Sequence, residues 1–342
     1  MKPLSKALPG SEGTLDRGKA PPAQPRGSHR AKNGVLEPPR IGPATWCGRK
    51  EEDPHPIVYQ GCHETDARTL LQGGINSYCL SYYNADTGGE RTLIKHPGFH
   101  DPRCRTFLDS GAFSFLVFGY QGRMSEADVE KKVEPYIQRY SEWVLRYGED
   151  RFDFHITFDY RVSASITWKM TKRLRELGLH PTPVYHGDSS ISWLLRYIDA
   201  GYPLICLSKR FFLNDRQGLQ RFYDQVFNIC EKREVALHGL ACTGREAWTL
   251  PWYSVDSTSL VKDAGMGVLS YWNSKGLQHK VPVSRESRGT VGEELLSYIK
   301  DCDLTLKELA EERTKRVLFN AIMLKRFLDS RKAKVWNKKT LF

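Results

Sequence analysis

The sequence predicts an α/β protein built on a closed (β/α)8 barrel. The 342-residue chain is long enough for one large domain with appendages. Between residues 56 and 256, eight short apolar segments alternate with mostly helical ones, which is the strand count of a closed parallel barrel. Several of these segments end in a polar residue: Asp109, Asp159, His186 and Asp256. A parallel barrel builds its site from residues at the carboxyl ends of its strands.

The first 55 residues are rich in Pro, Gly, Lys and Arg and hold few aromatic residues. Such a segment buries too little apolar surface to offset chain entropy, so residues 1–55 are predicted to be a disordered basic tail. The tail has no apolar stretch of the kind found in secretory signals, and no apolar run in the chain approaches the length of a membrane span. A cytoplasmic protein is expected.

Ordered structure is expected to begin near residue 56. The predicted strands are 56–59, 75–83, 106–109, 152–159, 182–186, 203–208, 235–239 and 253–256. A capping-box pattern at Ser125 opens a long amphipathic helix that ends at Gly148, with a kink expected at Pro135. Further helices are expected over 163–177, 191–200 and 218–232, and two more, 291–302 and 305–331, close the chain.

The predicted organisation is therefore a barrel domain at 56–290 and a basic helical extension at 291–342. Residues 313–342 carry ten basic residues and one acid, a net charge of +9, whereas residues 56–312 carry −2. A near-neutral body with a basic end indicates a polyanionic partner, most simply nucleic acid; a solvated helix with a loose tail is the alternative. The residues expected to bind phosphates are Lys325, Arg326, Arg331, Lys332, Lys334, Lys338 and Lys339.

Neither a metal nor another cofactor is expected. The closest two of the eight cysteines are twelve residues apart, so the spacing of a usual structural zinc site is missing. His96, His100 and Cys104 are spaced by four, but Pro97, Gly98 and Pro102 prevent the helix that would align them. The cysteines are expected to be mostly buried thiols in a reducing compartment.

Five strand-end motifs occur in a fixed order. They are Asp109-Ser110-Gly111-Ala112-Phe113, Phe158-Asp159, His186-Gly187, His238-Gly239-Leu240 and Val255-Asp256-Ser257-Thr258. This series, over about residues 56–260, resembles the tRNA-guanine transglycosylase superfamily, which includes the queuine and archaeosine enzymes. Its members are (β/α)8 barrels that exchange a guanine in nucleic acid for a 7-deazaguanine base.

The chain departs from the tRNA-acting enzymes at three places. His186 stands where the family has glutamine, and Ala112 where it has glycine. The family's zinc motif after the last strand is missing, because residues 257–342 contain only Cys302. The sequence therefore looks closer to the divergent phage and bacterial branch that inserts 7-deazaguanines into DNA (DpdA-like). DNA is the expected polymer, and a tRNA-acting relative without zinc is the alternative.

Base exchange at an N-glycosidic bond needs one carboxylate to attack C1′ and a second to manage the proton of the base. The resemblance makes Asp256 the nucleophile and Asp109 the general acid/base, although the chemistry alone leaves these roles interchangeable. The resemblance also implies that Asp159 binds the pyrimidine edge of the base and that Phe113 stacks on it. The full substrate-binding set is Asp159, Ser110, Phe113, His186, Gly187, His238 and Gly239.

Other interpretations stay open. Phe113 is alternatively a core residue, and His186 a hydrogen-bonded core histidine. The whole barrel is alternatively an inactive nucleic-acid-binding subunit, which the presence of both Asp109 and Asp256 argues against, or a glycoside hydrolase, whose barrels usually present Trp at the strand ends. The expected partners are nucleic acid and a free 7-deazaguanine base, with a homodimer or a partner subunit also compatible with the resemblance.

Overall fold

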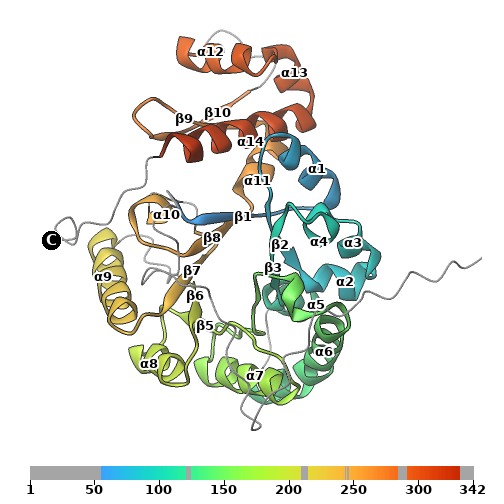
Figure 1. Ribbon diagram of the computed structural model, residues 1–342, viewed down its shortest axis with the longest axis vertical. Helices are drawn as coiled ribbons and strands as arrows, with labels where there is room; N and C mark the ends of the chain where they lie inside the picture. Colours follow the sequence, from blue (N-terminus) through green and yellow to red (C-terminus); the bar gives the residue numbers. More distant parts are fainter. Residues whose placement is uncertain are drawn as a thin grey trace, which may run out of the picture. The chain divides into compact units, whose positions relative to one another are not determined.

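Eight parallel strands curl into a barrel with helices on its outside (Figure 1). The structure is a computed structural model that describes residues 55–120, 125–208, 215–242, 244, 246–283 and 291–331. Neighbouring strands follow the order β4-β3-β2-β1-β8-β7-β6-β5. The strands are β1 (Ile57–Gly61), β2 (Ser77–Ser81), β3 (Arg105–Asp109), β4 (Phe154–His155), β5 (Val184–His186), β6 (Leu204–Ser208), β7 (Ala236–Leu240) and β8 (Ser254–Ser257).

The ring closes between β4 and the segment that leads into β5. Ile156 forms a parallel bridge with Thr182. The Thr157 amide donates to the Thr182 carbonyl (3.0 Å), and the Thr182 amide donates to the His155 carbonyl (2.7 Å). The predicted (β/α)8 barrel is thus confirmed, and all eight predicted strands are present, some shorter than expected.

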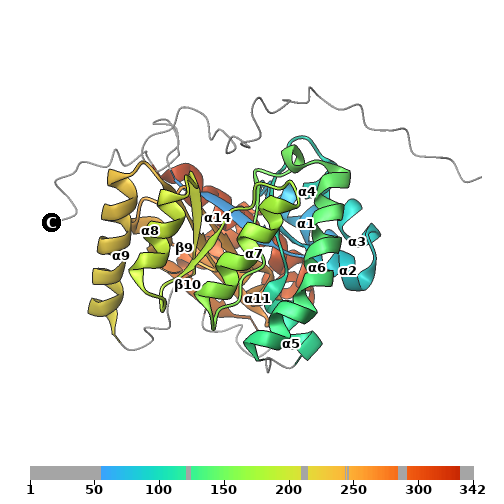
Figure 2. The ribbon, with the colours of Figure 1, turned by 90° about the horizontal axis from the view of Figure 1, so that it is seen from below.

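Helices connect the strands and cover the barrel (Figures 1 and 2). They are α1 (Glu64–Gln72), α2 (Tyr82–Gly88), α3 (Arg91–Ile94), α4 (Pro97–His100), α5 (Ala112–Tyr120), α6 (Glu126–Tyr147), α7 (Ala164–Glu176), α8 (Ile191–Asp199), α9 (Arg216–Lys232), α10 (Glu246–Thr249) and α11 (Ser259–Gly265). The Ser125 hydroxyl caps α6, which continues as a helix through Pro135. The sequence pattern did not predict α1 to α5, all of which are only four to nine residues long.

The barrel interior is a packed core. Alternate strand residues point inward, and the interior cluster contains Tyr59, Phe107, Phe154, Ile156, Val184, Leu204, Cys206 and Ala236. The Tyr59 hydroxyl donates to Asp153, and Arg105 Nε pairs with Asp153 Oδ2 at 2.9 Å. These contacts join residues just before β4 to β1 and β3, away from the strands' carboxyl ends.

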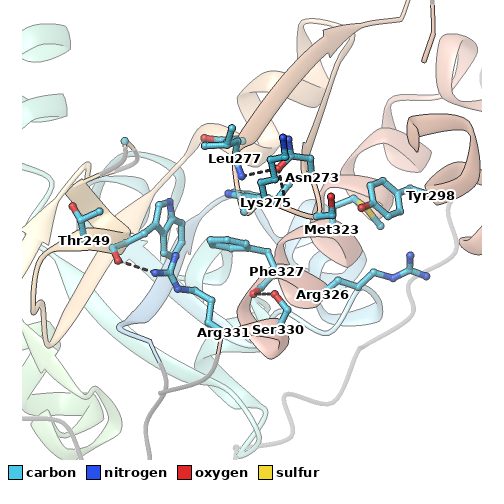
Figure 3. Close-up of a pocket in the computed structure, with 16 residues that line it drawn as sticks. Thr249, Asn273, Lys275, Leu277, Tyr298, Met323, Arg326, Phe327, Ser330 and Arg331 are labelled. Atoms are coloured by element: carbon cyan, nitrogen blue, oxygen red, sulfur yellow. Dashed lines mark hydrogen bonds between the residues drawn. The ribbon is translucent and has the colours of Figure 1, made fainter. Parts of the chain in front are cut away.

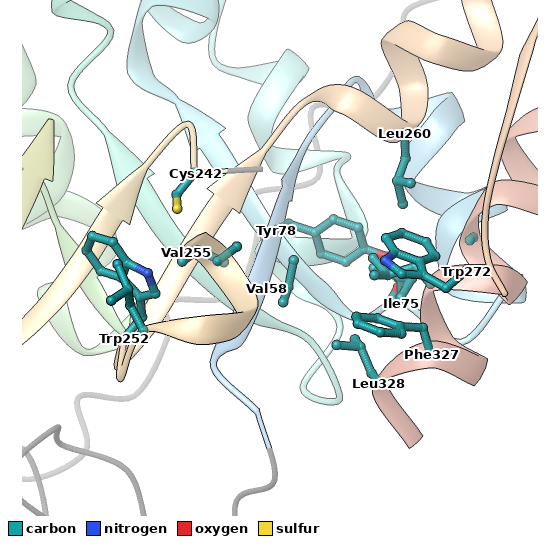
Figure 4. Close-up of a cluster of buried hydrophobic side chains, with 14 of the residues drawn as sticks. Val58, Ile75, Tyr78, Cys242, Trp252, Val255, Leu260, Trp272, Phe327 and Leu328 are labelled. Atoms are coloured by element: carbon teal, nitrogen blue, oxygen red, sulfur yellow. The ribbon is translucent and has the colours of Figure 1, made fainter. Parts of the chain in front are cut away.

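A hairpin and three helices follow the last barrel strand. The antiparallel strands β9 (Val268–Trp272) and β10 (Gln278–Pro282) were not predicted. The three helices are α12 (Glu293–Asp301), α13 (Leu306–Glu311) and α14 (Arg313–Ser330). In Figure 4, Trp272 of β9 and Phe327 of α14 lie beside barrel residues such as Val58 and Tyr78, within one apolar cluster.

The single helix predicted over 305–331 is in fact two. Its capping box at Thr305 and Glu308 is present, but Glu312 is extended (φ −111°, ψ 113°) and separates α13 from α14. The buried Arg316 guanidinium donates to the carbonyls of Leu309 (2.8 Å) and Ala264 (2.7 Å). Because Arg316 provides a donor for a carbonyl at the end of α13, the break leaves that group satisfied.

Helix α14 ties the predicted extension to the barrel. The buried Asn320 accepts from the Ser270 amide (2.8 Å) and donates to the carbonyls of Leu260 (3.1 Å) and Val268 (3.3 Å). Arg313 forms a two-bond ion pair with Asp66 of α1 (2.6 and 2.9 Å). The described part of the extension therefore packs directly on α1, α11 and β9. No helix in the described ranges is long and apolar enough to cross a membrane. Apart from His55, the predicted tail lies outside those ranges.

Candidate active site

A pocket of about 1380 Å³ lies at the carboxyl ends of the barrel strands. Five of the residues predicted from the sequence line it: Asp109, Phe113, Asp159, His186 and Asp256. They come from the ends of β3, β5 and β8, from the start of α5 and from the segment after β4. The parallel strands bring together carboxylates that are far apart in the chain, as the strand-end pattern predicted.

A tight turn holds Asp109. The Gly111 amide donates to Asp109 Oδ2 (3.2 Å), and Gly111 has a left-handed φ of +75°. A Cβ at Gly111 would lie 2.5 Å from the Tyr83 Cβ, so the position requires glycine. Ser110 is fully buried and its hydroxyl donates to the Thr157 carbonyl (3.0 Å), so it fixes the turn and does not line the pocket.

The pKa of Asp109 is raised to about 7. Burial is the largest cause, followed by the negative charges of Asp159 and Asp256; the Gly111 and Ser110 amides oppose the shift. At neutral pH a substantial fraction of the molecules therefore carries a proton on Asp109. Such a group can both donate and accept a proton.

Different contacts fix Asp256. Its Oδ1 accepts from the Ala241 amide (2.9 Å) and lies 3.3 Å from His238 Nε2. The other ring nitrogen of the buried His238 lies 2.8 Å from the Ser254 hydroxyl. A neutral His238 that donates from Nε2 and accepts at Nδ1 satisfies both contacts. Ala241 has an uncommon left-handed φ of +48°, which places local backbone strain beside the carboxylate.

Asp159 and His186 face each other in the pocket. His186 Nε2 lies 3.1 Å from Asp159 Oδ2, which is ion-pair distance for a protonated imidazole. Although His186 is only 3% exposed, neither ring nitrogen has a hydrogen-bond partner among the described residues. A hydrogen-bonded core histidine therefore does not describe His186. His186 Nδ1 has neither a hydrogen-bond partner nor an ion-pair partner among the described residues.

Exposed apolar side chains line part of the pocket. Phe113 is 75% exposed, which excludes the alternative that it packs in the core. Val117 on the same helix and Val162 after Asp159 are also exposed and line the same pocket. The sequence pattern did not indicate the two valines; the available signal was the apolar stretch Phe115–Phe118, which makes α5 apolar around most of its circumference.

The remaining predicted residues lie elsewhere. His238 contacts Asp256 but does not line the pocket. Gly187 donates its amide to the Ser208 carbonyl (2.9 Å), and Gly239 packs against Cys242 and Trp252.

Of the basic residues, Lys325 pairs with Asp329, and Arg326 lies 3.3 Å from Asp301. Arg331 contacts the Trp248 carbonyl, and none of these three lines the pocket. Lys332, Lys334, Lys338 and Lys339 lie outside the described residues.

A cysteine and a histidine at the pocket form a pair that the sequence pattern did not indicate. Cys62 Sγ lies 3.8 Å from His96 Nε2. Burial raises the pKa of the Cys62 thiol and lowers the pKa of His96 to about 4. Both groups are therefore neutral near pH 7, so the pair is not an activated thiolate nucleophile. In the described ranges, no three His, Cys, Asp or Glu residues are grouped to hold a metal ion.

Comparison with known proteins identifies no family. No family model and no curated protein matches the chain. Among solved structures, a protein assigned as a fructose-1,6-biphosphate aldolase from Coccidioides immitis matches with 10% identity and a TM-score of 0.39, over 82% of this chain and 92% of its own. An aldo-keto reductase from a Medee basin deep-sea metagenome library, MGS-M4, matches with 12% identity and a TM-score of 0.32, over 78% and 92%. Such distant likeness carries no inference about function.

Proposed function

We propose that this protein is a guanine transglycosylase that exchanges a guanine in nucleic acid, with DNA as the preferred polymer, for a 7-deazaguanine base. The observation that supports this most directly is the gathering of Asp109, Asp159 and Asp256 in one pocket, with the pKa of Asp109 near neutrality. Two differently tuned carboxylates suit glycosyl transfer with an acid/base and a nucleophile. The third carboxylate is available to bind the base.

The exchange runs in two steps through a covalent intermediate. In the first, a carboxylate oxygen of Asp256 bonds to C1′ as the bond from C1′ to N9 of guanine breaks, and protonated Asp109 gives its proton to the departing base. In the second, the nitrogen of the incoming base bonds to C1′, the Asp256 ester bond breaks, and Asp109 takes the proton from that base. Both carboxylates return to their starting states.

The same pocket offers suitable contacts for a purine-like ring. A carboxylate at Asp159 can accept from the ring N–H and the exocyclic amino group of guanine. His186, whose Nε2 lies 3.1 Å from Asp159 Oδ2, provides a donor for the carbonyl at the same edge once a bound base occupies the Asp159 carboxylate. Exposed Phe113 provides a flat apolar face for stacking.

The alternatives fit these residues less well. A glycoside hydrolase also uses two carboxylates, but no Trp, which such barrels usually present at their strand ends, is among the described residues that line this pocket. An inactive binding subunit would have no use for the contacts that Asp256 receives from Ala241 and His238. The preference for DNA over tRNA rests on the resemblance and on the missing zinc motif.

The test is incubation of the full chain with labelled 7-deazaguanine and either plasmid DNA or tRNA. We expect label in DNA, none with Asp256→Asn, and undiminished labelling with the control Asp224→Asn, which changes an exposed carboxylate on α9. Label in tRNA alone would reassign the polymer. No label in either polymer, with intact binding of both, would contradict the proposed enzyme.

A further inference from the structure

A second groove lies outside the active-site pocket, between α10, the β9–β10 turn and the C-terminal end of α14 (Figure 3). Its volume is about 1100 Å³, and it shares no lining residue with the active-site pocket. Helix α14 connects the two, because Arg313 at its start lines the pocket and Arg331, just after its end, lines the groove. Its 18 residues span about 27 Å at 1.5 Å per residue.

Aromatic rings form one wall of the groove. Phe327 stacks on Trp272 with ring centroids 4.8 Å apart and meets Trp248 edge-on at 4.9 Å. Trp272 and Phe327 are mostly buried, whereas Trp248 and Tyr298 are partly exposed to the groove. Partly exposed aromatic rings on a rigid base suit stacking of nucleobases, which is sequence-tolerant.

Three cationic side chains line the groove, and one carboxylate, Glu294, accepts from its lining residues Ser274 and Tyr298. Lys275, Arg326 and Arg331 line it, and no Asp or Glu is among its described lining residues. Arg331 is half-buried over the Phe327 ring (5.1 Å) and donates to the Trp248 carbonyl (2.9 Å). Burial lowers its pKa, and within the described ranges no carboxylate pairs with Arg331 or with exposed Lys275, whereas Arg326 has Asp301 at 3.3 Å. Two cations without counter-ions favour an anionic ligand.

We propose that this groove binds a single-stranded stretch of the polymer substrate, with bases against Trp248 and phosphates at Lys275 and Arg331. The inference rests on the proposed function for the identity of the polymer. The chain's own end is a poor occupant by charge, because residues 332–342 contain four lysines and no acid. The two sites lie at opposite ends of α14, about 27 Å apart along the helix, so a strand must be several nucleotides long to reach both.

The test measures binding of fluorescent dT20 to the full chain by anisotropy over a range of salt concentrations. This oligonucleotide holds no guanine, so base exchange does not enter the readout. Lys275→Glu and Arg331→Gln should each weaken binding about three- to tenfold and flatten the salt dependence by about 0.7 per lost phosphate contact. Trp248→Leu should weaken binding with the slope unchanged, because it removes stacking and no charge.

The matched control is Lys300→Glu, an exposed lysine on α12 outside the groove, which should stay within twofold of the parent protein. Circular dichroism checks that each variant is folded. If folded Lys275→Glu and Trp248→Leu both bind dT20 as tightly as the control, the groove is not a strand site. If dTMP competes as well as dT20, the groove is a mononucleotide site and the strand proposal is wrong.

The two proposals fail separately. Loss of dT20 binding in the groove variants, with no base exchange in any polymer, would support the groove and contradict the transglycosylase. Base exchange together with unchanged dT20 binding in those variants would support the transglycosylase and contradict the groove.

Discussion

At the scale of single residues, Asp109 and Asp256 end two strands of one barrel but differ in their surroundings. Asp109 is partly buried beside two other carboxylates, it accepts from backbone amides, and its pKa is near 7. Asp256 receives an amide from the strained Ala241 and faces a histidine held by Ser254. This contrast favours Asp109 as the proton carrier and Asp256 as the nucleophile.

Asp109→Asn should change how stability depends on pH. Folding raises the pKa of Asp109 from 3.8 to about 7, so the folded state favours the protonated carboxyl. Its contribution to stability is fully present below pH 3.8 and is lost as the pH rises through about 7. At about 1.4 kcal/mol per pKa unit, the loss is at most about 4 kcal/mol.

Asparagine does not ionise, so the free energy of unfolding of Asp109→Asn should lack this fall with rising pH. Urea unfolding at pH 4.5 and pH 8 measures the free energy, with Asp224→Asn as control. The free energy of unfolding could also fall between these pH values by as much in Asp109→Asn as in the parent protein. That result would show that the ionisation of Asp109 has no effect on stability.

Asp256→Asn should abolish the covalent intermediate. With the incoming base withheld, the parent protein should form a denaturant-stable adduct with DNA, visible on a denaturing gel. The amide keeps the shape of the side chain but cannot form the glycosyl ester, so the variant should bind DNA within about twofold and give no adduct. An adduct with Asp256→Asn would place the nucleophile elsewhere, and Asp109→Asn would then be examined first.

At the scale of secondary-structure elements, α14 has a structural role that its sequence pattern did not predict. The barrel's last helix, α11, has only seven residues, and α14 packs beside it against α1 and the β9–β10 hairpin. Asn320 fixes this arrangement through backbone groups of two elements: Leu260 of α11, and Val268 and Ser270 of β9. Arg313 and Arg316 add contacts at the start of the helix.

Asn320→Leu should therefore destabilise the fold by about 2–4 kcal/mol. It leaves one buried amide and two buried carbonyls without their side-chain partner, and an unsatisfied buried polar group costs about 1–3 kcal/mol. Chemical denaturation measures the loss, and Thr314→Leu, at an exposed position of the same helix, is the control. Equal unfolding midpoints for Asn320→Leu and Thr314→Leu would mean that the contacts of α14 are replaceable.

At the scale of the whole molecule, positive charge is concentrated at the end of the chain. Residues 313–342 carry +9, but Arg313, Lys315, Lys325 and Arg326 each have a carboxylate within 4 Å. Arg316 is buried, so Arg331 is the described basic residue of this stretch whose charge remains for a polyanion, and four lysines follow it in the sequence. Non-specific affinity should therefore depend on the final segment more than on α14 itself.

Removal of residues 332–342 should flatten the salt dependence of duplex DNA binding. Four lysines are lost, and each phosphate contact contributes a slope of about 0.9, so the change is at most about 3.6. The buried face of α14 ends at Leu328 and the cut keeps Arg331, so folding and base exchange at saturating DNA should persist. Equal slopes for the full and truncated chains would mean that the barrel holds the polymer.

The strands and the strand-end acids could be predicted from the sequence because both depend on local pattern. Short apolar segments punctuated by polar residues indicate buried parallel strands, and strand ends of one barrel meet at one mouth. The hairpin was missed because Gln278–Pro282 alternates between exposed and half-buried residues and holds little apolar character. Its local signal was the Asn273–Gly276 turn, where Asn273 accepts from the amides of Lys275 and Leu277.

Only the tertiary structure decided the properties that depend on residues distant in sequence. The raised pKa of Asp109 follows from its burial and from the approach of Asp159 and Asp256, and the 3.1 Å contact between His186 and Asp159 joins two separate strand ends. The break at Glu312 depends on the contact of Arg316 with the Leu309 carbonyl. The second groove depends on a hairpin and two helices that meet at Phe327. Local sequence fixes which residues end a strand, whereas burial and electrostatic interaction depend on neighbours that the chain brings together only on folding.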